Sequence, residues 1–229
     1  MARGYFSRDD WEAKIPGPDY KEMIKSAKRE VIADLAAIAQ PDRNFQRRVR
    51  RAGADPDVLL DAVTGPFSQP DVVLVRAVGV IRQADAEIGA HVDDRDQALA
   101  HLWFYERRLM LQDTIGVTVN AYRQILAKAL YGDSRRPLPS TSSAQELKEI
   151  AEAAGIPRIE NAADKILEPA AIVAKARARR EVGVRFMQEA VWTLSEPPYD
   201  WSPDKTAEHA DITRKQVYNS RDAARRRHR

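Results

Sequence analysis

The sequence contains no cysteine, and this absence removes several kinds of chemistry at once. A chain without thiols forms no disulfide, binds no zinc through cysteine and has no cysteine nucleophile. The histidines are scattered, and none has a second histidine or a carboxylate at metal-ligand spacing on a predicted helix face. They are His91, His101, His209 and His228. The sequence therefore predicts no metal site and no cofactor.

Long apolar runs are also missing. No stretch approaches the run of about 18 apolar residues that a membrane-spanning helix needs. The first ten residues, MARGYFSRDD, lack the apolar core of a secretory signal. We therefore expect a cytoplasmic protein that does not enter a membrane.

Sequence motifs of common enzymes are absent as well. The phosphate-binding loop, the glycine-rich dinucleotide motif, the nucleophile elbow and the zinc-protease motif do not occur. The acidic residues Glu106, Asp93 and Asp94 are better explained as helix surface and as the cap of a new helix. We predict no enzymatic activity, because catalysis here would need carboxylates gathered from several helices.

The apolar residues that are present follow a helical period. Residues 19–40 carry an apolar stripe at 3.6-residue spacing with charges opposite it. The valine-rich stretch at 72–81 is continued by good helix formers to Gly89, which makes it too long for a strand. We predict an all-α protein with an N-terminal helical bundle and a smaller C-terminal helical domain.

One shift in composition suggests where these domains meet. Residues 133–143 are rich in proline and serine and predict a linker. It would separate an N-terminal domain at 1–132, used for dimerisation or partner binding, from a C-terminal domain at 144–229. The second domain opens with Ser143 and Glu146, a capping box.

The last thirty residues hold the most informative pattern. Ser202 is a candidate N-cap and Pro203 suits the first position of a helix. Asp211 tolerates the left-handed conformation of a tight turn, and Thr213 is a fresh N-cap. The sequence predicts one short helix that ends near Ala210 and a second that begins after Thr213.

This pattern resembles the helix-turn-helix of DNA-binding proteins over residues 202–224. The family has a small residue, a glycine, a small hydrophobe, a serine or threonine and a β-branched residue at fixed offsets. The matching residues are Ala207, Ile212, Thr213 and Val217, and the departures are Thr206, Asp211 and Ser220. The segment AEAAGIPR at 151–158 parallels AEHADITR at 207–214, so residues 144–167 form either a second, degenerate copy or a plain helix hairpin.

Charge favours a polyanionic partner for this segment. Residues 212–229 contain seven Lys or Arg residues and a single acid, a net charge of +6. The whole chain carries +3, so the remaining residues together carry −3. A basic segment on an acidic body is typical of a part that binds nucleic acid. A second basic segment, with five arginines at 43–51, is either another phosphate contact or a solvated face.

The resemblance implies that the second helix enters the major groove of double-stranded DNA. Arg214, Gln216 and Asn219 would then read bases, because their side chains match guanine or adenine edges. The remaining residues expected at the interface are Thr213 and Lys215 on the outer face, Lys205, Tyr218, Arg225, Arg226 and Arg227 near phosphates, and Arg221.

The sequence thus predicts a sequence-specific DNA-binding protein, of the kind that regulates transcription on bacterial chromosomes or mobile elements. A homodimer is expected, since one such motif reads only a few base pairs. Two alternatives stay open. One is a DNA-packaging, partition or replication factor that binds DNA as a larger assembly, and the other is an adaptor that binds an acidic protein.

Overall fold

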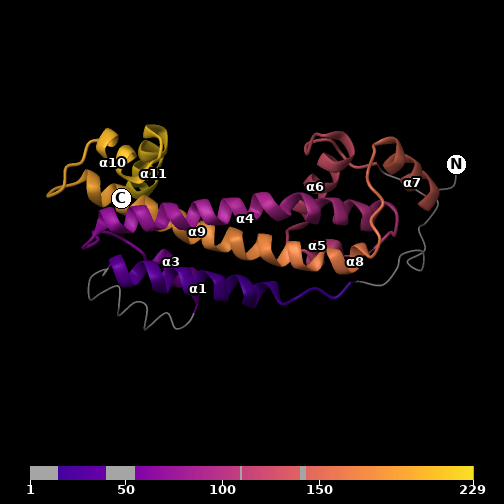
Figure 1. Cartoon of the computed structure of the whole chain (residues 1–229), viewed down its shortest axis with the longest axis horizontal. Helices are drawn as coiled ribbons and strands as arrows, with labels where there is room; N and C mark the ends of the chain where they lie inside the picture. Colours follow the sequence, from indigo (N-terminus) through magenta and orange to yellow (C-terminus); the bar gives the residue numbers. More distant parts are fainter. Residues whose placement is uncertain (1–14, 40–54, 109, 140–142, 229) are drawn as a thin grey trace. The chain divides into compact units, whose positions relative to one another are not determined.

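The computed structural model describes residues 15–39, 55–108, 110–139 and 143–228, and within them it contains helices and no strand (Figure 1). The predicted all-α fold is confirmed. The helices are α1 (Tyr20–Ala39), α3 (Pro56–Asp61), α4 (Pro70–Phe104), α5 (Leu111–Thr114), α6 (Val119–Tyr131), α7 (Ala144–Ala153), α8 (Ala162–Lys165), α9 (Leu167–Ser195), α10 (Pro203–Ala210) and α11 (Arg214–Arg227). The basic segment at 43–51 lies outside the described residues.

The prediction that a new helix begins at Asp93 and Asp94 is wrong. Both residues lie inside α4, a single helix of 35 residues. Gly89 does not end the helix, although glycine costs about 1 kcal/mol in a helix interior. Buried residues on either side of it, such as Ala84 and Leu99, hold the helix through this point.

Two compact units make up the described chain. The first contains residues 15–20 and the described part of Ile88–Ala174, and the second contains the described parts of Lys21–Glu87 and Lys175–Arg229. Helices α4 and α9 contribute to both units, because each is long enough to do so. The described chain is therefore divided within its long helices, and the described residues of the segment at 133–143, where the sequence predicts a linker, belong to the first unit.

In the first unit, Tyr20 holds the turn after α5. Its hydroxyl donates a hydrogen bond to the carbonyl of Thr114 at 2.8 Å. Gly116 has a φ of +66°, and a Cβ built there would lie 2.5 Å from the Tyr20 ring. Glycine is thus required at this position for both its conformation and its lack of a side chain.

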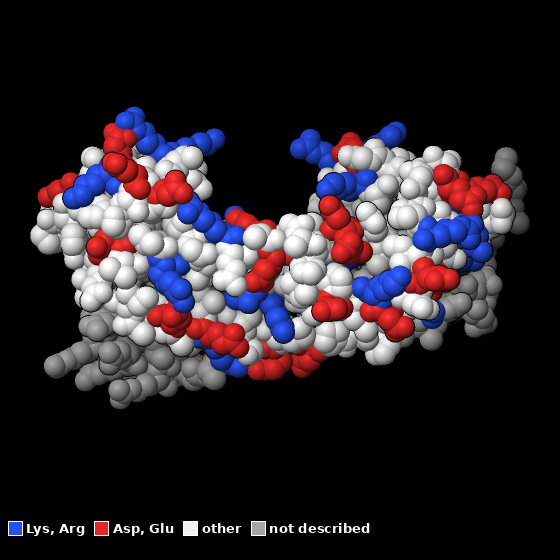
Figure 2. Space-filling view, viewed as in Figure 1, with Lys and Arg blue, Asp and Glu red and all other residues white. Residues whose placement is uncertain are grey.

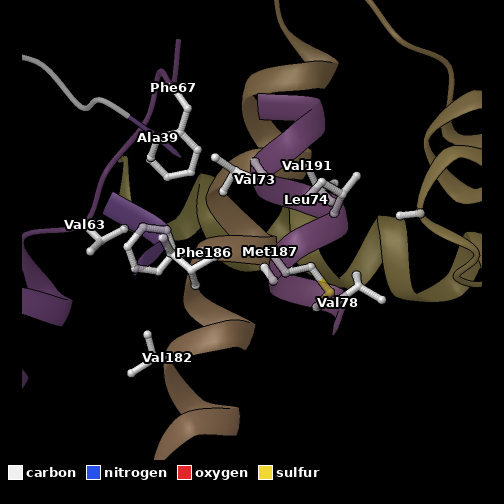
Figure 3. Close-up of a cluster of buried hydrophobic side chains, with 14 of the residues drawn as sticks. Ala39, Val63, Phe67, Val73, Leu74, Val78, Val182, Phe186, Met187 and Val191 are labelled. Atoms are coloured by element: carbon white, nitrogen blue, oxygen red, sulfur yellow. The ribbon is translucent and has the colours of Figure 1, made fainter. Parts of the chain in front are cut away.

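The second unit has one continuous apolar core, drawn in part in Figure 3. Helices α1, α4 and α9 supply most of it, and Ala207, Ala210 and Val217 add the inner faces of α10 and α11. Gly183 of α9 allows close packing on α4, since a Cβ there would lie 3.1 Å from the carbonyl oxygen of Ala77. The C-terminal helices are therefore fixed to the unit through its core.

The first copy of the repeated pattern folds differently from the second. Helix α7 begins at the predicted capping box of Ser143 and Glu146. No helix follows directly where α11 follows α10, because residues 156–159 are not helical and α8 has only four residues. Residues 144–167 thus do not repeat the arrangement of α10 and α11.

Candidate nucleic-acid interface

Local capping chemistry defines α10, the turn and α11. The Ser202 hydroxyl accepts a hydrogen bond from the Lys205 N–H at 3.2 Å, as an N-cap does. Asp211 ends α10 in the left-handed conformation, with φ 51° and ψ 52°. Thr213 and Gln216 form a capping box at the start of α11. The predicted caps and helix boundaries are confirmed.

The inner face of the helix pair is buried. Ala207 is 9% exposed and Val217 is 4% exposed, and both belong to the core of the second unit. Thr206 and Ser220, two departures from the helix-turn-helix pattern, are buried as well. The Thr206 hydroxyl donates to the Ser202 carbonyl at 3.1 Å, so its polar group is satisfied within the helix.

Asp211, the third departure, has its own contact. Arg82 of α4 donates to the Asp211 carboxylate at 2.7 Å and also to its main-chain carbonyl. Aspartate tolerates the left-handed conformation better than most residues with a side chain. Aspartate here thus adds a carboxylate contact with α4 that glycine would not provide, while the contact with the main-chain carbonyl does not depend on the side chain. Because both side chains are exposed, this ion pair contributes little to stability.

The outer face of α11 is exposed and polar in its first two turns. Arg214, Lys215 and Asn219 are exposed, and Tyr218 is 44% exposed. The guanidinium of Arg214 forms an ion pair with Asp204 of α10. Lys215 and Asn219 have no side-chain partner within the described part of the chain. These two side chains are therefore the ones most available to a ligand.

Gln216 is committed to the cap. Its side-chain oxygen accepts from the Thr213 N–H at 2.8 Å and from the Thr213 hydroxyl at 2.9 Å. A glutamine that reads adenine uses both its oxygen and its amide N–H groups. In this arrangement only the N–H groups of Gln216 are free for a base.

Aromatic rings hold two of the cations expected near phosphates. The Lys205 ammonium lies 4.1 Å from the centre of the Trp201 ring. The Arg221 guanidinium lies 5.2 Å from the Tyr218 ring, and its Nε is 3.7 Å from the Asp222 carboxylate. These contacts orient the charges. Lys205 is exposed and its contact is weak enough to rearrange, whereas the Arg221 side chain is only 25% exposed.

The three consecutive arginines at the end of α11 have different surroundings. Arg225 pairs with Glu196 at 3.2 Å. Arg227 donates through Nε and Nη2 to one oxygen of Glu189, at 3.0 and 2.8 Å. Arg226 is exposed and has no carboxylate partner in the residues that the structure describes. Figure 2 shows Lys and Arg side chains at the end of the second unit that carries α10 and α11, with acidic side chains among them.

Glu189 of α9 is a residue that the sequence analysis missed. It is fully buried, and besides Arg227 its carboxylate accepts from the Gly65 N–H at 3.1 Å. His228 approaches it at 2.8 Å and stacks on Trp192, with ring centres 3.9 Å apart. No sequence signal marks this carboxylate, because its partners come from distant positions in the chain. The cluster anchors the end of α11 to α9.

The described residues contain no group of three or more His, Asp or Glu side chains arranged to hold a metal ion. Among their helices, none is both long enough and apolar enough to span a bilayer. No protein-family model, curated protein or solved structure matches the chain.

Proposed function

We propose that the protein binds double-stranded DNA in a sequence-specific manner and reads the major groove with α11. The observation that carries this proposal is the outer face of the first two turns of α11. It presents exposed Arg214, Lys215 and Asn219 next to a tight turn, while Val217 on the opposite face is anchored in the core. An α-helix fits the major groove, and a rigidly held one places its side chains against base edges.

The contacts of these residues suggest separate roles. Lys215 and Asn219 meet bases directly, lysine at guanine and asparagine at adenine. Arg214 exchanges Asp204 for a guanine or a phosphate on binding, which is an inexpensive exchange between exposed groups. Thr213 and Gln216 start the helix at the right place, and the free N–H groups of Gln216 add a donor.

Phosphate contacts are assigned to exposed cations around this face. Arg226, Lys205 and Arg225 are exposed cations, and Arg226 is free to bind phosphate, while the Tyr218 hydroxyl and the partly buried Arg221 lie on the same helix pair. Arg227 is removed from the set expected from the sequence, because a buried carboxylate holds it. Phosphate contacts supply affinity and orientation without sequence information.

Regulation of transcription in a bacterial cytoplasm, from a chromosome or a mobile element, is the role we propose for this binding. One reading helix contacts few base pairs, so we propose a homodimer on a two-fold site. The first unit is then available for dimerisation or for a protein partner.

Selection from a random duplex library tests the proposal. The full chain is used at low salt, bound duplexes are sequenced, and affinities are measured by fluorescence anisotropy. We expect an enriched motif with two-fold symmetry and a dimer on it in sedimentation velocity. A larger assembly on DNA would favour a packaging, partition or replication factor. Absence of binding to any duplex at low salt would leave the adaptor that binds an acidic protein.

A further inference from the structure

A second basic surface lies in the first unit, at a cleft of about 660 Å³ beside α6. Its lining contains three arginines, Arg123, Arg135 and Arg136, and no acidic residue. The cleft is as large as typical small-molecule sites, which run from about 300 to 1,000 Å³. It is separate from the residues assigned to DNA.

The cleft is built by a turn in the segment that the sequence presents as a linker. Gly132 ends α6 in the left-handed conformation, with φ 70°. The chain then turns back, and the Asp133 carboxylate accepts from the Arg135 N–H at 2.9 Å. Arg136 lies over the Tyr131 ring, 4.6 Å from its centre. Residues 134–138 thus form one wall of the cleft and α6 forms another.

The arginines of this cleft are not neutralised by the protein. Arg123, Arg135 and Arg136 are exposed, and none has a carboxylate partner within the described part of the chain. Most other arginines of the described chain form ion pairs, for example Arg179 with Glu87 and Arg180 with Asp85. Three unpaired guanidinium groups around one cleft favour a ligand with several negative oxygens, such as a chain of phosphates.

Aromatic and amide groups complete the lining. Trp103 is partly exposed and packs edge-on against Phe104, with ring centres 4.5 Å apart. Tyr122 lines the same cleft, and burial raises the pKa of Tyr122 above its usual value, so this phenol stays neutral. Asn120, Gln124 and Ser134 add neutral hydrogen-bonding groups. An aromatic wall beside amides suits a planar heterocycle with polar edges.

We propose that this cleft binds a nucleoside polyphosphate. The three arginines hold the phosphates, Trp103 stacks on the base, and Asn120 and Gln124 contact base or ribose edges. Figure 2 shows Lys and Arg side chains around the part of the first unit that carries α6, with acidic side chains among them, whereas the lining of the cleft itself has no acidic residue. The proposal does not depend on the DNA-binding role of α11.

Calorimetric titration of the full chain with ATP, GTP, CTP and UTP, in magnesium-free buffer, tests this site. We expect saturable binding of one nucleotide per chain for at least one of the four. Arg135→Ala and Arg123→Ala should each weaken it about tenfold or more, the usual loss for a charge-assisted contact. Lys175→Ala in α9 is the matched control, since it removes an equal charge from an exposed site outside the cleft and outside the residues assigned to DNA, and it should leave nucleotide affinity unchanged.

The aromatic wall has its own test. Trp103→Leu should weaken nucleotide binding about tenfold while inorganic triphosphate, titrated in parallel, binds the variant and the parent alike. Because Trp103 also packs on Phe104, thermal unfolding of Trp103→Leu shows whether this variant is folded. Arg135→Ala changes an exposed side chain, so its test of nucleotide binding does not depend on an effect on folding. Inorganic triphosphate binding as tightly as every nucleotide would overturn the proposal. So would binding of single-stranded oligonucleotides with no binding of free nucleotides, or no binding at all.

Discussion

Arg227 at the end of α11 donates both Nε and Nη2 to one oxygen of Glu189 in α9, at 3.0 and 2.8 Å. Glu189 is fully buried, whereas its neighbour in the cluster, His228, is partly exposed. A buried carboxylate that loses its partner is costly, because its charge has no water to replace the lost contact. This relationship ties the orientation of α11 to the core of the second unit.

Stability should therefore distinguish two adjacent arginines. Arg227→Ala should lower the free energy of unfolding by about 1–3 kcal/mol, less than a complete loss of partners because Gly65 and His228 remain on Glu189. Arg226→Ala should change it by less than about 0.5 kcal/mol. Urea unfolding of both variants measures the difference. Equal stabilities would show that the Glu189 contact does not fix the helix.

The salt dependence of DNA affinity should also distinguish Arg226 from Arg227. If Arg226 contacts a phosphate, Arg226→Ala should reduce the slope of log affinity against log salt by about 0.9. Arg227→Ala should leave the slope unchanged at temperatures where the variant is folded. Anisotropy titrations between about 50 and 200 mM salt cover the range where such slopes are measured. A smaller slope for Arg227→Ala alone would reverse the assignment.

Gly116 and Gly132, two of the left-handed glycines of the first unit, predict different costs for the same change. Gly116→Ala should lower the free energy of unfolding by about 2–4 kcal/mol, through backbone strain and a clash with the Tyr20 ring. Gly132→Ala has the same backbone problem, with φ +70°, but a Cβ there meets nothing within 4 Å, so about 1 kcal/mol is expected. Chemical unfolding of the two variants gives the comparison, and similar losses would argue against close packing of Tyr20 on Gly116.

Tyr20 should make stability sensitive to alkaline pH. Burial raises the pKa of Tyr20 to about 12, and the positive charge of Arg95 opposes part of this rise. The unfolded chain ionises at pH 10, so stability is fully present below pH 10 and falls as pH rises towards 12. The loss from this group is on the order of 2 kcal/mol. Tyr20→Phe should show a shallower decline in urea unfolding between pH 9 and pH 11, whereas parallel declines would contradict the shifted pKa.

The parts of the fold that depend on neighbouring residues were predictable from the sequence. Ser202, Asp211 and Thr213 act within a few positions of themselves, so α10 and α11 begin and end where the capping pattern predicts. The Ser143 capping box is equally local. Such features need no knowledge of the rest of the fold.

The missed features depend on residues far apart in the chain. Arg82 reaches Asp211, and Arg227 reaches Glu189, only because α4 and α9 pack beside the C-terminal helices in the second unit. Capping rules also suggest a helix start at Asp93, which tertiary packing overrides in α4. The basic cleft beside α6 was not predicted. The proline and serine residues at 133–143 indicate an exposed segment, but they do not show which residues of the fold that segment packs beside.

The most direct measurement of the central claim is the base preference of α11 variants on the selected duplex. Each base pair of the site is changed in turn, and affinities are measured for the parent and for Lys215→Ala, Asn219→Ala and Arg226→Ala. We expect Lys215→Ala and Asn219→Ala each to lose about 1–3 kcal/mol of preference at one base pair, while Arg226→Ala weakens all sequences alike. If Lys215→Ala and Asn219→Ala leave both affinity and preference unchanged, α11 does not read DNA.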